Sequence, residues 1–191
     1  LSMWEANRNM AMLSSGDRIY AASIDPAGLV ISERLRAQIA SLNAEIDNLA
    51  ATSNKYTYAA SALEEMHGQL TEIRSLAISA SNEATNSPEA QEAYNRAARD
   101  LMNQYNRSIE ITEYNGKKLY DGSEGSLANL SDLRDIDLSS AEAAASSIAL
   151  VDTAMDEIEQ AQIDLGATQR NELDSRRSQL EITKENLIAS G

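Results

Sequence analysis

The sequence predicts a mainly α protein: an elongated, antiparallel bundle of long helices of the coiled-coil type, with a small β-hairpin at one end. Three observations predict this class. Leucine or tyrosine recurs every seven residues over one long stretch, which is the spacing of a helix that other helices bury along one side. Ala, Leu and Ile dominate while Phe is absent, so the core is expected to be a narrow seam. Turn signals halfway along the chain predict the hairpin.

Composition limits the possible partners and chemistry. The 191 residues are expected to form one rod-like domain over 1–191, and their formal net charge of −14 disfavours binding to nucleic acid or to anionic membranes. There is no cysteine, which rules out disulfides and thiolate metal sites. No stretch of about 18 apolar residues occurs and no basic segment precedes an apolar one at the start, so we expect neither membrane insertion nor a cleaved secretory signal.

The first long helix is expected to begin at Pro26, with Asp25 as its cap, after a break at residues 13–16 (LSSG). Its pattern stays helical for about 55 residues, or roughly 80 Å. The expected buried seam of this helix contains Leu35, Leu42, Leu49, Tyr56, Leu63 and Leu70. A second buried row is expected four residues later in each heptad, at Ile39, Ile46, Ser53, Ala60 and His67.

The rest of the N-terminal half, residues 1–112, is expected to hold a second helix. Ser87 and Pro88 break the first helix and start the next, which should return antiparallel with Tyr94, Leu101 and Tyr105 on its buried stripe. Residues 113–138 then form a short insert. The turn at Asn115 predicts a hairpin, and residues 133–138 alternate apolar and charged residues as an exposed strand would.

The C-terminal segment, residues 139–191, is expected to be one helix that starts near Ser139 or Ser140. Between Gln169 and Leu173 the heptad pattern has one extra residue, which should locally alter the supercoil. Gly166 lies inside this helix, which suggests close backbone packing there. The seam residues expected from this segment are Met155, Ile158, Leu165, Leu180 and Leu187.

No residue pattern points to catalysis. His67 is the single histidine and lies on the second seam row, where a packed helix residue is the simpler interpretation. Carboxylates are numerous but spread around the polar helix faces, and no loop has the spacing of a calcium site. We therefore expect no catalytic, cofactor or metal site and a structural protein, not an enzyme.

Several segments resemble bacterial flagellin, the subunit of the flagellar filament. Residues 13–19 (LSSGDRI) and 25–39 (DPAGLVISERLRAQI) are similar to the family patterns LSSGxRI and DAAGLAISERMRxQI. Residues 113–119 (EYNGKKL) are similar to FNGxxL, and DLGA at 164–167 and ENL at 185–187 match the C-terminal half. After LGA the family usually reads xQNRL, whereas residues 168–173 (TQRNEL) are one residue longer.

The resemblance implies a self-assembling subunit of the filament used for cell motility. Its partners would be other flagellin subunits together with flagellar export and assembly chaperones, and its location would be the extracellular flagellum, reached through the flagellar secretion system. The resemblance also implies a core fragment without the terminal helices that line the filament channel and without most of the variable outer domain, so that the fragment is expected to be monomeric or to associate weakly by itself. The alternatives are a hook–filament junction protein, which shares the LSSG start, and a coiled-coil signalling module.

The resemblance to flagellin also implies possible recognition by an innate immune Toll-like receptor. Recognised members tend to carry QRxRELAVQ in the first long helix, where residues 71–79 of this chain read TEIRSLAIS. Arg74 and Leu76 match that pattern, but Glu72 has the opposite charge to the usual Arg. The resemblance therefore implies a receptor surface around Glu72, Arg74 and Leu76 with weak or absent signalling. An ordinary helix face and seam remains the other interpretation of Arg74 and Leu76.

Overall fold

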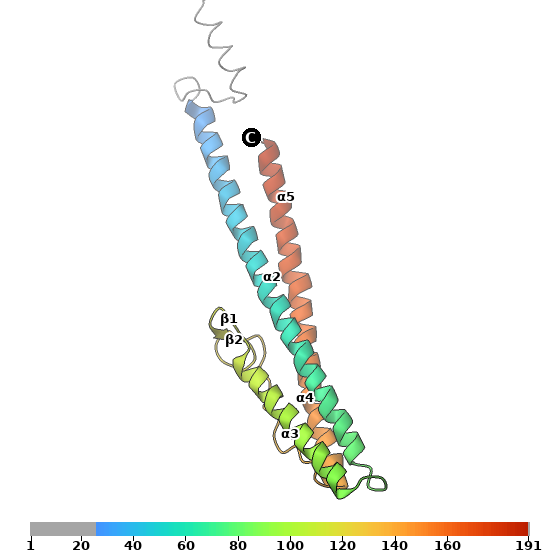
Figure 1. The fold of residues 1–191 in the computed structure, drawn as a ribbon. Helices are drawn as coiled ribbons and strands as arrows, with labels where there is room; N and C mark the ends of the chain where they lie inside the picture. The colour runs from blue at the N-terminus through green and yellow to red at the C-terminus, as the bar shows by residue number, and fades with distance from the viewer. Residues whose placement is uncertain (1–25, 191) are drawn as a thin grey trace, which may run out of the picture. The chain divides into compact units, whose positions relative to one another are not determined.

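The computed structural model describes residues 26–190 (Figure 1). The break expected at residues 13–16 and the cap at Asp25 lie outside this range. The expected mainly α fold with a small β-hairpin is confirmed. In order, the elements are α2 (Pro26–Ala80), α3 (Pro88–Ile111), β1 (Glu113–Tyr114), β2 (Lys117–Lys118), α4 (Ala141–Thr168), the π-helix η1 (Gln169–Asp174) and α5 (Ser175–Ser190).

The chain divides into two compact units. Unit 1 comprises residues up to Ala50 and from Ser175 onward, and unit 2 comprises Ala51–Asp174. Helix α2 is continuous through the first boundary, and the second boundary falls between η1 and α5. The single domain over 1–191 stays a prediction.

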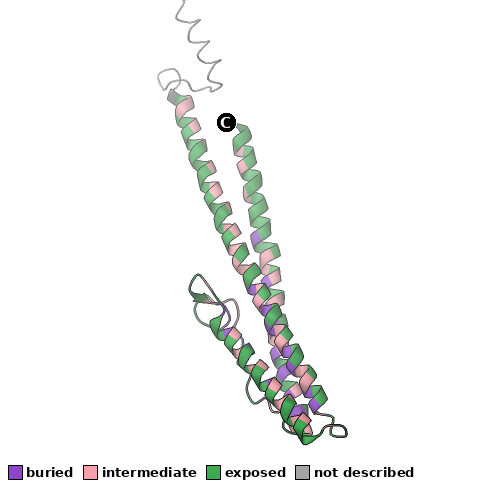
Figure 2. Ribbon diagram, in the orientation of Figure 1, coloured by how far each residue is buried: buried purple, intermediate pink, exposed green. Residues whose placement is uncertain are grey.

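The core of unit 2 lies where α2, α3 and α4 run side by side, and most of the buried residues are found there (Figure 2). From α2, Leu63 and Leu70 of the expected seam are fully buried. The second row is wrong over this stretch, because Ala60 and His67 are only half-buried. The buried second row lies three residues after each position of the first row and consists of Ala59, Met66, Ile73 and Ala80.

The buried second row of α2 differs from the expected one because segments other than α4 also contact this helix. The Tyr120 hydroxyl donates to the carbonyl of Ala59 at 2.5 Å, and Nε2 of Gln91 donates to the carbonyl of Ala80 at 3.0 Å. Helix α2 is thus covered on two sides, by α4 and by α3 with the segment that follows it, so its buried face is wider than a two-helix seam. Burial also raises the pKa of the Tyr120 hydroxyl, because the charged form would lose its hydration.

Helix α3 begins and ends as its sequence directs. Ser87 is the N-cap, and its hydroxyl accepts from the backbone N–H of Ala90 at 3.2 Å, while Pro88 takes the first helical turn. Tyr105 of the expected stripe is fully buried, and Tyr94 and Leu101 are half-buried. The helix ends at Ile111, where Thr112 has an extended backbone and starts the hairpin.

The expected hairpin forms at the predicted turn. Strands β1 and β2 pair antiparallel, with Glu113 opposite Lys118 and Tyr114 opposite Lys117. Asn115 and Gly116 form the two-residue turn with φ of 51° and 74°. Asn and Gly tolerate positive φ, and turns of this hand match the twist of paired strands. The hairpin prediction is therefore confirmed.

The exposed strand expected at residues 133–138 is wrong. These residues form neither helix nor strand, and Leu133, Ile136 and Leu138 are buried. The segment lies along α3 and α4 and satisfies its backbone through their side chains. Asn106 of α3 holds Leu133 from both sides: its Oδ1 accepts from the backbone N–H at 2.7 Å and its Nδ2 donates to the carbonyl at 2.8 Å.

Further side chains of α3 and α4 hold the same segment. Oδ1 of Asn95 accepts from the backbone N–H of Leu138 at 2.9 Å, and the Ser147 hydroxyl both accepts from the N–H of Asp137 and donates to its carbonyl, each at 3.0 Å. Because side chains on regular helices supply these bonds, the segment needs no partner strand.

The contribution of the two hydrogen bonds between Asn106 and Leu133 to stability can be tested. Replacing Asn106 by alanine is expected to lower the free energy of unfolding by about 1–3 kcal/mol, because the backbone N–H and carbonyl of the buried Leu133 lose their partners. Chemical denaturation measures this change. Asn103→Ala is the control, since Asn103 is exposed on the same helix. Equal stability of the two variants would contradict the stabilising role of the hydrogen bonds between Asn106 and Leu133.

Helix α4 begins at the expected place, with the Ser140 hydroxyl accepting from the N–H of Ala143 at 3.1 Å. Ile158 and Leu165 of the expected seam are buried, and Met155 is half-buried. The close backbone packing expected at Gly166 is wrong: an added Cβ would meet only the Arg170 guanidinium, at 3.8 Å. That glycine leaves ordinary room for a side chain.

The irregular heptad coincides with a change of helix type. Residues Gln169–Asp174 form a π-helix, at the place where the sequence has one residue too many. A π-turn accommodates a single extra residue within an α-helix. Leu165 before it and Leu173 within it are both buried, so the apolar stripe is kept across the insertion.

Candidate assembly surface

The seam of unit 1 is only partly covered. On α2, the seam residues Leu35, Leu42 and Leu49 are half-buried, as are Leu180 and Leu187 on α5. Among residues 27–50 and 175–190 no residue is buried. In unit 2, by contrast, the same row of α2 continues into fully buried leucines, after the half-buried Tyr56. The two units thus use one sequence pattern with different degrees of burial.

Polar contacts add little to unit 1. Arg176 of α5 lies 3.8 Å from the carboxylate of Glu45 on α2, and both side chains are about half exposed or more. An exposed ion pair of this kind contributes little stability. Unit 1 also exposes large apolar side chains outside the seam, namely Val30, Ile31, Ile182 and Ile188. Its apolar surface is therefore available to further helices.

The three residues of the predicted receptor surface lie on α2 in unit 2 with different environments. Glu72 is exposed. Arg74 donates from Nε to Asp152 of α4 at 2.6 Å, and this carboxylate raises the pKa of the guanidinium. Leu76 is half-buried and packs against the core. Arg74 and Leu76 thus also hold α2 on its neighbours, as the ordinary-helix interpretation expects.

The described residues offer little that resembles a site for chemistry. Nε2 of His67 lies 3.7 Å from a carboxylate oxygen of Glu159. Within residues 26–190, no three His, Cys, Asp or Glu residues come together as metal ligands would. No helix in the same range has the length and apolar character needed to cross a bilayer.

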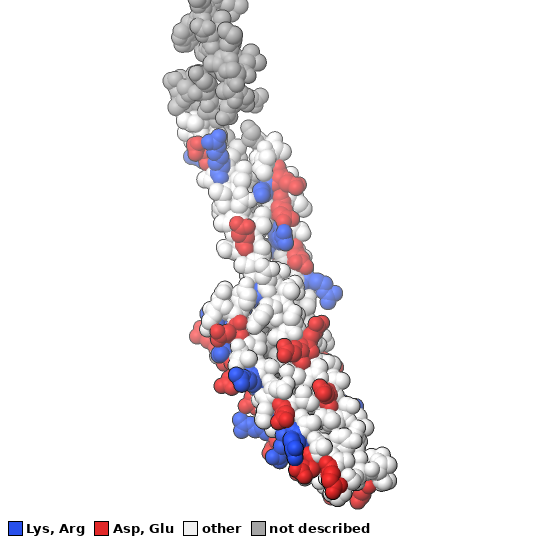
Figure 3. Space-filling view, viewed as in Figure 1, with Lys and Arg blue, Asp and Glu red and all other residues white. Residues whose placement is uncertain are grey.

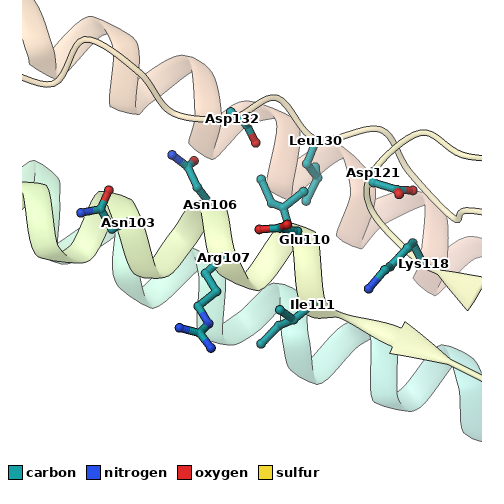
Figure 4. A pocket seen from close by; sticks show the side chains of 10 residues that line it. Asn103, Asn106, Arg107, Glu110, Ile111, Lys118, Asp121, Leu130 and Asp132 are labelled. Carbon is teal, nitrogen blue, oxygen red and sulfur yellow. The ribbon is translucent and has the colours of Figure 1, made fainter. Parts of the chain in front are cut away.

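A groove of about 940 Å³ lies in unit 2 between the C-terminal half of α3 and residues 118–132 (Figure 4). Its walls carry both signs of charge: Arg107 and Lys118 are cationic, and Glu110, Asp121 and Asp132 are acidic. In Figure 4 these side chains come from both walls and do not converge on one point. The groove therefore lacks the single cluster of polar groups that orients a small molecule.

Two asparagine side chains of α3 hold the segment 133–138 through hydrogen bonds to Leu133 and Leu138, which were not predicted from the sequence. Asn95 and Asn106 are eleven residues apart, a spacing that returns to the same side of a helix after three turns. Both border the buried stripe of α3. Two amide side chains at that spacing beside an apolar stripe are the sequence feature that could have predicted these hydrogen bonds.

Comparison with known proteins agrees with this geometry. The family model for the bacterial flagellin N-terminal helical region matches residues 3–125. Flagellin from Halalkalibacterium halodurans is 32% identical over 203 aligned positions, which cover 98% of this chain and 74% of that protein. Flagellin from Clostridium tyrobutyricum is 38% identical over 127 residues, covering 66% of this chain and 33% of that protein.

A solved structure extends the similarity to the fold. The crystal structure of Bacillus cereus flagellin superposes with a TM-score of 0.54 at 20% identity, covering 74% of this chain and 88% of that chain. The alignment with the Clostridium protein spans about a third of that relative's length. On the family match and the relative from Halalkalibacterium, this chain belongs to the bacterial flagellin family.

Proposed function

We propose that this chain is a structural subunit of a bacterial flagellar filament, which assembles by packing its helices against those of other copies. The role is mechanical and not catalytic, and its place is the filament outside the cell. Export through the flagellar secretion system, with an export chaperone, belongs to the same proposal. The observation that carries it is the half-buried apolar seam of unit 1.

The seam supports assembly for an energetic reason. Leu35, Leu42 and Leu49 follow the heptad spacing of a helix with neighbours on its apolar side. Two helices by themselves leave these side chains partly in water. Each additional apolar area that a neighbouring copy removes from water contributes about 25 cal/mol per Å². A contact repeated along a filament adds this contribution at every subunit, while the net charge of −14 disfavours irregular association.

Seeded growth tests the proposed function. Full-length protein is added to short fragments of flagellar filament and followed by electron microscopy. Elongation of the seeds is the expected result. Addition of a short terminal layer without elongation would indicate a hook–filament junction protein. Failure to bind seeds at any protein concentration would overturn both roles.

Receptor recognition is the second part of the proposal, and Glu72 gives it a direct test. The wild-type chain is expected to signal weakly through the flagellin-sensing Toll-like receptor, because Glu72 has the opposite charge to the usual Arg. Glu72→Arg is expected to increase the response of receptor-reporter cells at least about tenfold, since one well-placed Arg at an interface centre can contribute 2 kcal/mol or more.

Glu65→Arg is the matched control, because Glu65 is also exposed on α2 and lies outside the receptor pattern. The same potency for wild type and Glu72→Arg would contradict the assignment of Glu72. A strong response to the wild type would contradict the predicted weakness.

A further inference from the structure

Two exposed rows of equal spacing and opposite charge lie on α3 and α4. The α3 row consists of Arg99, Asn103 and Arg107, and the α4 row consists of Asp156, Gln160 and Asp164. All six side chains are exposed. In each row the residues are four apart, so each row rises about 6 Å per step along one ridge of its helix.

The two arginines are available for a partner. Among the described residues, neither Arg99 nor Arg107 makes a hydrogen bond or ion pair. The pKa of Asp137 is lowered chiefly by its hydrogen bonds with Ser139, and the charge of Arg99 adds a smaller contribution. Four other cations of unit 2 are in ion pairs, namely Arg74 with Asp152, Arg96 with Glu92, Lys118 with Glu113 and Arg134 with Asp132. In Figure 3, blue and red side chains are interspersed along the lower left edge, where α3 lies.

The α4 row offers the opposite charge. Helix α4 contains six acidic residues and neither Lys nor Arg. Asp156 has no ion pair among the described residues, and Nε2 of Gln160 donates to Asp164 at 2.9 Å, which holds that carboxylate on the row. A guanidinium binds a carboxylate through two parallel hydrogen bonds, which favours Arg opposite Asp.

Apolar side chains lie beside both rows. Ile111 continues the α3 row by one more step and is 56% exposed, while Ile163 lies beside the α4 row and is 64% exposed. Contact between the rows would remove both from water, which adds a hydrophobic contribution to the charge complementarity.

The rows cannot meet within one molecule. Helix α3 buries Ala98 and Tyr105 in the unit 2 core, and α4 buries Ile158 and Leu165 in the same core. The exposed rows therefore lie on faces that point away from this shared core.

We propose that the α3 row of one copy packs against the α4 row of a second copy. This inference rests on the proposed self-assembly and names the surfaces that meet. Because the two surfaces differ, the contact is heterologous, and a pair of copies keeps one free α3 row on one copy and one free α4 row on the other. Contacts of this type repeat into open arrays, whereas a self-complementary contact stops at a dimer.

Charge reversal with rescue tests the pairing in seeded growth of the full-length chain. Arg99→Glu with Arg107→Glu is expected to raise the protein concentration needed for growth at least about tenfold. The control Lys117→Glu with Arg134→Glu changes the net charge equally at exposed residues outside the row. Adding Asp156→Arg and Asp164→Arg to the α3 reversal is expected to restore growth. Circular dichroism confirms that each variant is folded.

Each outcome bears on the pairing. Growth of the α3 reversal equal to that of the control would overturn the role of the arginines. Loss of growth without rescue by the α4 reversal would overturn α4 as their partner. In both cases growth of the wild type shows that the filament proposal itself stands. A wild type that does not grow on seeds would instead overturn the proposed function.

Zero-length carbodiimide cross-linking of a variant with lysines in the α3 row provides a second measurement. Lys117 lies outside the α3 row and is the control, because it is expected to give no cross-link to α4. In the variant Arg99→Lys with Arg107→Lys, amide cross-links from these lysines to Asp156 or Asp164 are expected in filaments. Mixing ¹⁴N- and ¹⁵N-labelled subunits distinguishes links between copies from links within one. The absence of links between copies would contradict the pairing.

Discussion

Replacing Leu70 by alanine is expected to lower the free energy of unfolding by about 2–5 kcal/mol, whereas Leu42→Ala should cost the isolated chain much less. The two leucines lie on one helix and on one row of the heptad pattern. Leu70 is fully buried among α2, α3 and α4, and its removal leaves a cavity. Leu42 is half-buried, so water already reaches part of its side chain.

The effect on assembly should be the reverse. Leu42→Ala is expected to raise the concentration needed for filament growth, because the missing methyl groups are those that a neighbouring copy covers. Urea denaturation of the isolated chain measures the first effect, and seeded growth at a temperature where both variants are folded measures the second. Equal losses of stability in the two variants would contradict the difference in burial between the units.

Deleting Asn171 is expected to leave the protein folded and to convert the π-helix into continuous α-helix. Asn171 is exposed within Gln169–Asp174, where the sequence holds one residue too many. A π-turn holds one extra residue within an α-helix, so removing one residue from this segment allows regular α-helical hydrogen bonds to run through it. The melting temperature should therefore change little.

Deleting Gln160 is the matched control with a large expected effect. Gln160 is exposed on α4, but its removal rotates the residues between it and the π-helix by about 100°. Leu165 would leave the core, at a cost of about 2–5 kcal/mol. Thermal unfolding followed by circular dichroism compares the two deletions. A loss on deleting Asn171 as large as that on deleting Gln160 would contradict the assignment of the extra residue to the π-helix.

Periodicity and turn chemistry predicted much of this fold. The leucine row, the caps at Ser87 and Ser140, the Asn115 turn and the extra residue near Gln169 are all local features of the sequence. Each depends on a few neighbouring residues, and the structure places helices, hairpin and π-helix accordingly.

The expectations that were wrong depend on contacts between distant segments. The second row on α2 moved from His67 to Met66 because two neighbours, not one, cover the helix. The alternation at residues 133–138 suggested a strand, but amide side chains of α3 satisfy that backbone instead. Gly166 has no close neighbour, so its position in the helix is not explained by packing. Periodicity in one segment does not say how many partners that segment has.

Hydrogen exchange, measured on the isolated chain and on the filament, tests most directly whether neighbouring copies complete unit 1. In the isolated chain, amides of α2 at residues 63–77 are expected to exchange slowly and those at residues 35–49 much faster. In the filament, residues 35–49 and 175–190 should gain at least about tenfold protection, while residues 63–77 change little. Equal protection of both α2 segments in the isolated chain, or no gain at residues 35–49 on assembly, would contradict the proposed role of the seam.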